Sequence, residues 1–445
     1  MSQNPEKAGT TRREFFRHAA ATAAVGVAAT SAAKSSVYSL APQRVIGAND
    51  RILTGHVGMG GQGMTHLRLL GENATDFNCQ PIAVCDLYVR RKKQAQIDAK
   101  LSESQAFDDY GRLLENKDID AVWVTTSDNW HAPIALAAMQ AGKHVYIEKP
   151  MCRSIEEAYA LFDAAKKTGR VVQVGSQGCS DQKWHVAGQV VKSGRIGKAI
   201  MAQGSYCRNG RDGEWNYYHI DEDASPRSSG DGYVNWEVFR KGLGPKEWDP
   251  DRYFRWRKYW AYGNGIMGDL FPHRLHPLMI ALALPLEGDR GFPSRVASTG
   301  GIYVQKVNPV TGKPDREVPD LTNIVVDFPE EVTVMLLGST INEQGWPDMI
   351  RGNKATLYFG GNGVKVQPER VWAEEVEGGI EPVPGEGERI ETHQRNFLDC
   401  VRTSGVPNCN IDLALRAQVM ISLGEMAYRK GKTMHFDPKT RKAFG

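Results

Sequence analysis

The sequence predicts an α/β protein in which a doubly wound parallel sheet at the N-terminal side precedes an α+β domain with a largely antiparallel sheet. Two observations predict this architecture. Between residues 51 and 175, short apolar strands alternate with helical segments, which is typical of a parallel sheet with crossover helices. After residue 175, runs of β-branched residues recur at hairpin spacing, which indicates antiparallel pairing. We therefore expect one domain at 51–175 and a second at 176–445.

The first domain divides into five strands and three helices by its hydrophobic pattern. Proline in the first turn is compatible with the second helix, and Gly169 ends the third helix as a left-handed cap. The expected strands are 51–58, 81–85, 120–126, 143–147 and 171–175, and the expected helices are 64–70, 133–140 and 155–167.

A glycine-rich turn, Gly58-Met59-Gly60-Gly61-Gln62-Gly63, joins the first strand to the first helix. This GxGxxG pattern between a strand and a helix is the dinucleotide-binding fingerprint. Its glycines permit a tight turn, a close approach of the backbone to a pyrophosphate, and close packing of helix on strand. The free N–H groups of the helix N-terminus then favour the phosphates. We therefore assign Gly58, Gly60, Gly61 and Gly63 to cofactor binding.

Asp86 follows the second strand at the distance expected for an acid that binds ribose. Its carboxylate would hold the adenosine 2′- and 3′-hydroxyls and repel a 2′-phosphate, so the sequence predicts NAD as the cofactor. Arg90 and Arg91 lie close behind and keep NADP as an alternative.

The strand at 143–147 ends in Glu148-Lys149-Pro150. An unpaired ammonium is costly to bury, and by itself this stretch reads most simply as a solvated lysine in a loop. The carboxyl ends of parallel strands, however, meet at one crevice where ligands bind. We therefore expect Lys149 to line that crevice with Gly58, Asp86 and Asn129.

Three stretches together carry a family resemblance: GMGGQG (58–63), TTSDNWHAPIALAAMQAGKHVYIEKP (125–150) and GDLFPH (268–273). They resemble the Gfo/Idh/MocA family of dinucleotide-dependent oxidoreductases, from about residue 51 to residue 437. The resemblance implies a Rossmann domain in which Lys149 lies beside the nicotinamide ring and the hydroxyl that is oxidised. It further implies that His131 and its neighbours, together with Glu148, border the cofactor, and that the Lys149–Pro150 bond is often cis.

Asp269 and His273 are four residues apart, so at the start of one helix they would share a face. Histidine suits the removal of a hydroxyl proton near neutral pH, and an acidic neighbour can raise its basicity or hold a substrate hydroxyl. A lone histidine on a helix is more often structural. With Lys149, however, the pair matches the family's catalytic pattern, so we predict Lys149, Asp269 and His273 as catalytic residues. His276, where relatives often have aspartate, is predicted to contact substrate.

The second domain is expected to hold strands and helices in mixed order, the last two helices being amphipathic. The strands are 200–207, 295–304, 323–328, 332–337, 355–359 and 364–366, and the helices are 182–192, 392–401 and 413–428. In the family such a sheet builds dimers or tetramers with its outer face, so the resemblance implies a homodimer or homotetramer.

Aromatic and basic residues concentrate between residues 206 and 262. Aromatic faces stack on sugar C–H groups, and Arg, Lys and Tyr tips bond hydroxyls, so this region suits a carbohydrate. The alternative is that the rings only pack a long irregular loop. We predict substrate contacts from Arg255, Trp256, Tyr259 and Trp260.

The N-terminus reads as a targeting segment. Arg12 and Arg13 precede an Ala-rich apolar run that ends near Ala33, which predicts a twin-arginine (Tat) signal peptide at 1–33 and a linker at 34–50. The Tat route carries folded chains, and a protein uses it when a cofactor must be inserted first. The predicted location is the periplasm, with tightly bound NAD.

Composition excludes several classes of function. The formal charge of +3 argues against a nucleic-acid binder, and no segment is apolar over the length of a membrane span. The seven cysteines are scattered without CxxC spacing, so neither a metal site nor a disulfide framework is expected.

The sequence therefore predicts an exported NAD(P)-dependent oxidoreductase acting on a sugar hydroxyl. Because an exported cofactor must be recycled in place, one cycle oxidises one sugar and reduces a second carbonyl compound. The alternative is an NAD-dependent glycoside hydrolase that oxidises C3 transiently, eliminates the aglycone, adds water and reduces the ketone. Such hydrolases place a tyrosine where this chain has Phe271, so we rank that function second. A non-catalytic sugar-binding relative is the third possibility.

Overall fold

The computed structural model describes residues 47, 50–308, 311–360 and 363–445. The predicted signal peptide at 1–33 lies outside the described residues, as does the linker at 34–50 apart from Gly47 and Asp50. In the described part of the chain, no helix combines the length and apolar character needed to cross a bilayer.

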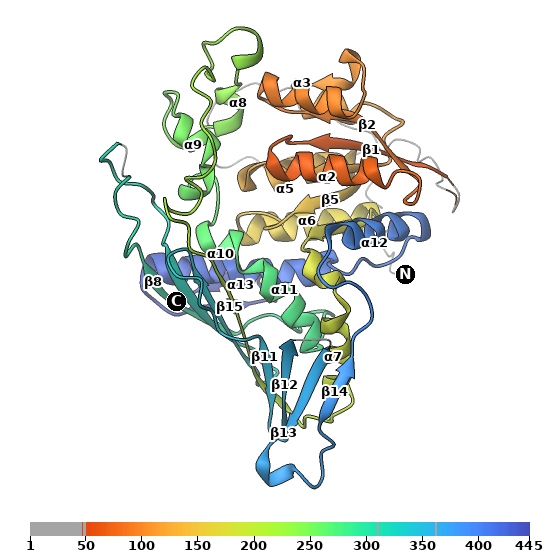
Figure 1. Cartoon of the computed structure of the whole chain (residues 1–445), viewed down its shortest axis with the longest axis vertical. Helices are drawn as coiled ribbons and strands as arrows, with labels where there is room; N and C mark the ends of the chain where they lie inside the picture. Colours follow the sequence, from red (N-terminus) through yellow and green to blue (C-terminus); the bar gives the residue numbers. More distant parts are fainter. Residues whose placement is uncertain (1–46, 48–49, 309–310, 361–362) are drawn as a thin grey trace, which may run out of the picture. The chain divides into compact units, whose positions relative to one another are not determined.

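The first sheet has six parallel strands in the order β3-β2-β1-β4-β5-β6 (Figure 1). The predicted doubly wound parallel sheet is thereby confirmed, because the strand order reverses direction next to β1. Its strands are β1 (Ile52–Val57), β2 (Cys79–Cys85), β3 (Ala106–Phe107), β4 (Ala121–Val124), β5 (His144–Glu148) and β6 (Val172–Gly175).

Helices connect these strands: α2 (Gly61–Glu72), α3 (Val89–Asp98), α4 (Tyr110–Leu114), α5 (Asp128–Gln140) and α6 (Ile155–Thr168). Helix α6 ends as predicted, since Gly169 caps its C-terminus at φ 65°. At its start the Ser154 side chain accepts a hydrogen bond from Glu157 N.

Helix α5 begins five residues before the predicted start, so Pro133 lies inside it and not in its first turn. A proline at this position leaves the carbonyl of Asn129, four residues earlier, without its helical N–H donor. Lys241 Nζ lies 3.4 Å from that carbonyl oxygen and supplies a donor from a distant segment. The sequence pattern contains no sign of this long-range partner.

The second sheet has ten strands in the order β14-β13-β12-β11-β7-β10-β9-β8-β15-β16. Neighbours pair antiparallel except β7 and β10, which confirms the largely antiparallel sheet. Its strands are β7 (Ala199–Cys207), β8 (Arg295–Gly301), β9 (Leu321–Asp327), β10 (Thr333–Ser339), β11 (Met349–Gly352), β12 (Ala355–Gly360), β13 (Gly363–Pro368), β14 (Gly379–Pro382), β15 (Met434–Asp437) and β16 (Lys442–Phe444).

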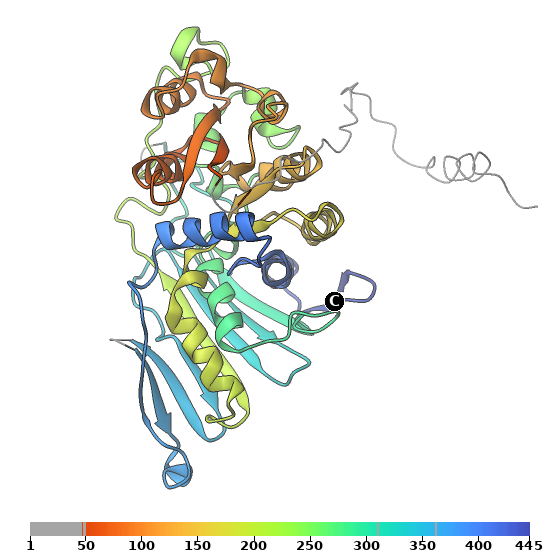
Figure 2. The same cartoon turned by 90° about the vertical axis from the view of Figure 1, so that its right-hand side faces the viewer.

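Helices α7 (Gln182–Lys192), α11 (Pro272–Ala281) and α13 (Ile411–Lys430) pack against this sheet (Figure 2). Helix α13 was expected to be amphipathic, but nearly all its positions from Ile411 to Ala427 are buried. The reason is that α6 packs on one side of α13 and β8 on another. Helix α12 (Ile390–Thr403) is amphipathic and packs Phe397 against Trp123 of the first sheet.

A long segment between β7 and α10 (Gly265–Asp269) contains the short helices α8 (Trp236–Arg240) and α9 (Pro250–Phe254). It lies beside α3 of the first sheet (Figure 1). Helix α10 ends at Asp269 and α11 begins at Pro272. The expectation that Asp269 and His273 share one helix is therefore wrong, because Pro272 starts a new helix.

Candidate active site

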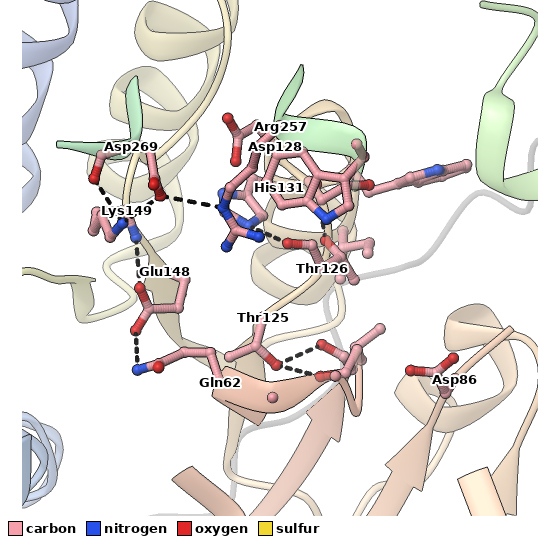
Figure 3. A pocket seen from close by; sticks show the side chains of 18 of the residues that line it. Gln62, Asp86, Thr125, Thr126, Asp128, His131, Glu148, Lys149, Arg257 and Asp269 are labelled. Atoms are coloured by element: carbon pink, nitrogen blue, oxygen red, sulfur yellow. Dashed lines mark hydrogen bonds and ion pairs between the residues drawn. The ribbon is translucent and has the colours of Figure 1, made fainter. Parts of the chain in front are cut away.

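A pocket of about 500 Å³ opens where the parallel strands end (Figure 3). Gly58, Asp86, Thr125 and Glu148 mark the carboxyl ends of β1, β2, β4 and β5 in its lining. The opposite wall comes from the second domain and includes His273 of α11. Asp86 thus lies at one end of the pocket, and Lys149 and His273 lie at the other end.

The glycine turn fits the role predicted for it. Gly58 has φ +91°, and a Cβ there would lie 2.8 Å from the backbone of Thr125. A Cβ on Gly63 would lie 1.9 Å from Gly58 O, so the first turn of α2 packs directly on the strand end. Thr125 Oγ1 donates to Gly58 O at 2.6 Å and fixes the turn. Gly60 and Gly61 line the pocket, whereas Gly63 acts through packing.

Asp86 is buried at the pocket wall. Its Oδ2 accepts from Met59 N at 2.6 Å and its Oδ1 from Tyr88 N at 2.8 Å. Burial raises the pKa of Asp86, while the nearby Arg91 charge and these backbone donors oppose the rise. The two bonds orient the carboxyl and leave acceptor positions free for ribose hydroxyls. The glycine cradle and this acid together fit the adenosine and pyrophosphate parts of NAD.

Lys149 stands at the end of β5, and the Lys149–Pro150 peptide bond is cis. Its Nζ donates to Asp269 O at 2.8 Å and to Asp269 Oδ1 at 2.9 Å. The ion pair offsets part of the cost of burying this ammonium. An ammonium has three donors, so one N–H remains for a ligand in the pocket.

Asp269 accepts hydrogen bonds from three side chains. Besides Lys149, Arg257 Nε lies 3.1 Å from Oδ1 and Trp215 Nε1 lies 3.1 Å from Oδ2. Burial would raise the pKa of Asp269, but the charges of Lys149, Arg257 and Arg208 outweigh it and hold the pKa below its usual range. Asp269 is therefore a fixed anion that positions cations, and not a proton carrier.

His273 lines the pocket and is 7% exposed. Its ring stacks on Tyr206 with centroids 4.5 Å apart, and its Nδ1 has no hydrogen-bond partner among the described residues. Burial and the Lys149 charge lower the pKa of His273 well below its ordinary value. The ring is consequently neutral near pH 7 and can accept a proton. The Glu388 carboxylate lies 4.0 Å from its Nδ1, and no hydrogen bond joins His273 to Asp269 among the described residues.

Glu148 and His131 both line the pocket, as predicted for cofactor neighbours. Glu148 Oε1 pairs with His66 Nε2 at 2.8 Å, and His131 Nδ1 lies 2.7 Å from Pro150 O. His131 thus fixes the turn that carries Lys149. Asn129 lies outside the pocket lining, since its side-chain amide faces Phe239 O at 3.4 Å.

Of the residues predicted to contact substrate, Trp256 lines the pocket and the other four do not. The four residues outside the lining are Arg255, Tyr259, Trp260 and His276. Arg255 and Tyr259 both pair with Asp251, and Arg255 also donates to main-chain carbonyls. Trp260 packs near Tyr428, and His276 is buried within α11. Internal contacts therefore account for these four side chains.

Among the polar pocket residues that the sequence analysis did not single out are Asp128 and Arg257. The Arg257 guanidinium lies 4.2 Å above the Trp256 ring and bridges to Asp269. Asp128, the first residue of α5, is 4% exposed, and no described residue gives its carboxyl a hydrogen bond or ion pair. Burial raises the pKa of Asp128 to about 7 despite the opposing charge of Arg257. Asp128 could have been predicted from the sequence only if the start of α5, and so the side of the helix that faces the pocket, had been placed correctly.

The six-stranded part of the chain matches a known family. A family model described as an oxidoreductase family with an NAD-binding Rossmann fold, Gfo/Idh/MocA, matches residues 52–176. The matched segment carries the glycine turn, Asp86 and Lys149, and it forms the six-stranded parallel sheet.

Curated relatives match parts of the chain. Inositol 2-dehydrogenase from Salmonella paratyphi B is 33% identical over 153 residues, which cover 34% of this chain and 45% of that protein. A glycosyl hydrolase family 109 protein from Saccharopolyspora erythraea is 30% identical over 221 residues, which cover 45% of this chain and 46% of that protein. The chain thus spans about half the length of these relatives.

Among solved structures, levoglucosan dehydrogenase in complex with NADH and L-sorbose is similar, with a TM-score of 0.65 at 17% identity. The match covers 87% of this chain and 99% of that chain, so the likeness extends over both sheets. At this identity it shows a shared fold.

Proposed function

Taking residues 52–176 as the NAD-binding domain of a Gfo/Idh/MocA oxidoreductase, we propose that the protein transfers hydride between a sugar hydroxyl and a tightly bound NAD. The observation that carries this proposal is the convergence of Lys149, His273 and the glycine turn on one pocket. A cation and a neutral base at the nicotinamide end are what oxidation of an alcohol requires.

Each group has a distinct role. NAD, when bound, accepts hydride from the carbon that carries the substrate hydroxyl. His273 takes the hydroxyl proton, since its ring lines the pocket and is neutral. The remaining N–H of Lys149 donates to the oxygen as negative charge develops there. Asp269 holds Lys149 and Arg257 in place, and Trp256 offers an aromatic face to the sugar.

A second function is favoured by the similarity to glycosyl hydrolase family 109 proteins. In that cycle C3 is oxidised, the C2 proton is removed, the aglycone leaves with a proton, water adds, and the ketone is reduced again. Phe271 is buried in the core and does not line the pocket, so its lack of a phenol decides little. Asp128 would supply the proton to the leaving oxygen. The direct oxidoreductase cycle needs no such proton donor and so requires fewer catalytic groups. We therefore rank the hydrolase second.

The proposal also includes export of the protein and its assembly into an oligomer. The paired Arg12 and Arg13 support Tat export to the periplasm with NAD already inserted. Replacing both arginines with lysine should retain the protein in the cytoplasm, as cell fractionation would show. Exposed Ile200 and Tyr358 on β7 and β12 support a homodimer or homotetramer built on the larger sheet, which light scattering would test.

The central experiment starts from purified protein. We would denature it, identify any released dinucleotide, and then follow reduced-nicotinamide absorbance while offering sugars. Reduction by a sugar that persists until a second carbonyl compound arrives supports the oxidoreductase. Release of an aglycone without net reduction favours the hydrolase. Binding of sugar without any dinucleotide, bound or taken up, would leave a non-catalytic binding protein.

A further inference from the structure

Residues 208–262, here called the insert, pair with the Rossmann domain through the main chain. Tyr88 and Val234 form an antiparallel bridge, with Val89 N bonded to Tyr233 O at 3.1 Å and Asn235 N to Leu87 O at 3.0 Å. These residues directly follow Asp86, the acid at the end of β2. The insert is thus attached at the ribose end of the dinucleotide site.

Ion pairs join the insert to α3 on its exposed side. Arg90 pairs with Asp223, with the closest atoms 2.5 Å apart, and with Asp221 at 3.3 Å. Lys93 pairs with Asp231, and Tyr88 Oη donates to Asp221 at 2.7 Å. Each of these charges on α3 faces an acid of the insert. Because the arginine and lysine pairs are largely exposed, salt will weaken them.

On its inner side the insert forms a wall of the pocket. Tyr253 and Phe254 of α9 line the pocket together with Asp86 and Arg91. The Arg91 guanidinium lies 5.3 to 5.7 Å from the ring centroids of Tyr88, Tyr253 and Phe254. Phe239 of α8 also lines the pocket, and its carbonyl accepts from Trp130 Nε1 at 2.9 Å. Aromatic rings and a planar cation at this end suit a flat heterocycle.

We propose that the insert is a structural part of the dinucleotide site, which it closes over the adenosine half, so that NAD leaves only when the insert detaches from α3. The inference deepens the cofactor half of the proposed function and does not depend on which sugar is oxidised. It assigns adenosine contacts to Tyr253 and Phe254, and it assigns retention of NAD to the acids that hold the insert. The geometry also explains how one chain can carry NAD through export without losing it.

The test measures release of the dinucleotide, independently of catalysis. Protein loaded with NADH is mixed with excess NAD, and the loss of bound-NADH fluorescence gives the release rate. The double variant Asp223→Asn, Asp231→Asn removes two exposed acids outside the pocket. We expect release about three- to tenfold faster than in the wild type, since the variant loses two of the exposed ion pairs that hold the insert to α3.

The matched control is Asp163→Asn, which removes a comparably exposed ion pair with Arg441 outside the insert. Its release rate should equal that of the wild type. High salt should speed release from the wild type and abolish the difference from the double variant. Equal release rates in double variant and wild type, or the same acceleration in the control, would overturn the inference while leaving the NAD site intact. A wild type that binds no dinucleotide at all would overturn the proposed function as well.

Discussion

Replacing Asp128 with asparagine should change how the stability of the protein depends on pH. Asp128 is the buried carboxyl that opens α5, and no described residue bonds to its side chain. Arg257 and Lys149 attract its charged form and Asp269 repels it, but burial dominates and raises the pKa to about 7. Asparagine has almost the same shape and does not titrate.

The sign of the effect follows from linkage. The folded protein holds the Asp128 proton more firmly than the unfolded chain, whose aspartates titrate near 3.8. This contribution to stability is fully present below the unfolded pKa and is lost as pH rises to about 7. The full difference corresponds to about 4 kcal/mol, because one pKa unit is worth about 1.36 kcal/mol. Between about pH 5 and pH 8 the loss is about 2 to 3 kcal/mol.

The assay is urea unfolding of wild type and Asp128→Asn across this pH range, at one fixed concentration of NAD. Other titrating groups act equally in both proteins, so the difference between their unfolding free energies isolates Asp128. Asp128→Asn should gain stability relative to the wild type as pH rises. Asp163→Asn, whose aspartate is exposed, should show no comparable trend. A difference between wild type and Asp128→Asn that stays constant from acid to alkaline pH would refute the reasoning.

Three further predictions concern the pocket. Lys149→Met should slow hydride transfer about 10²–10⁴-fold in single-turnover absorbance measurements while NADH release changes little, and an unchanged transfer rate would contradict its role. Gly58→Ala should lower the unfolding free energy by about 1–3 kcal/mol and weaken NAD binding, because the φ of +91° and the nearby Thr125 backbone leave no room for a Cβ. Thermal melting measures the first effect and NADH titration the second. In the Asp128→Asn background, the oxidation rate should stay level from about pH 8 to pH 6, because burial keeps His273 neutral there; a histidine-like fall near pH 6.5 would count against that assignment.

Local sequence signals were sufficient for the cofactor side of the site. The strand-glycine-helix order, the acid after β2 and the lysine after β5 each depend on residues that are close in the chain. Gly58 needs its positive φ for the turn itself, and Ser154 and Gly169 mark the ends of α6 within a few residues. Such features follow from short-range sterics and capping, so a single sequence can reveal them.

The choice between Asp128 and Asn129 shows where sequence reasoning stops. Residues three apart on a helix share a face, so with α5 starting at Asp128 both Asp128 and His131 reach the pocket. Asn129 then points toward Phe239 of the insert. A helix placed at Pro133 leaves these residues in a loop and gives no phase. Because the start of α5 was predicted five residues too late, Asn129 and not Asp128 was predicted to line the pocket.

The substrate side could not be predicted because its contacts are long-range. Arg257 contacts Asp269 through its Nε and stacks its guanidinium on Trp256, and neither contact has a local sequence signature. The abundance of aromatic residues at 206–262 favoured sugar binding for the set, with packing of a long loop as the alternative. Many of these rings pack in the cluster that joins the insert to the Rossmann domain. Six aromatic residues of this region also line the pocket: Tyr206, Tyr218, Phe239, Tyr253, Phe254 and Trp256.

The hydrogen bonds and ion pairs of the pocket also decide which side chains can accept or donate a proton. Asp269 accepts from Lys149, Arg257 and Trp215, and its pKa is held below the usual range, so it stays ionised while substrate reacts. Lys149 donates two hydrogen bonds to Asp269, and its positive charge stabilises negative charge on the substrate oxygen. Among the predicted catalytic residues this leaves His273 as the base, with Asp128 as a second group able to exchange a proton near neutral pH. A direct oxidation needs only the first of these, whereas elimination of an aglycone needs both. The effect of Asp128→Asn on sugar oxidation and on glycoside cleavage therefore separates the two proposed reactions.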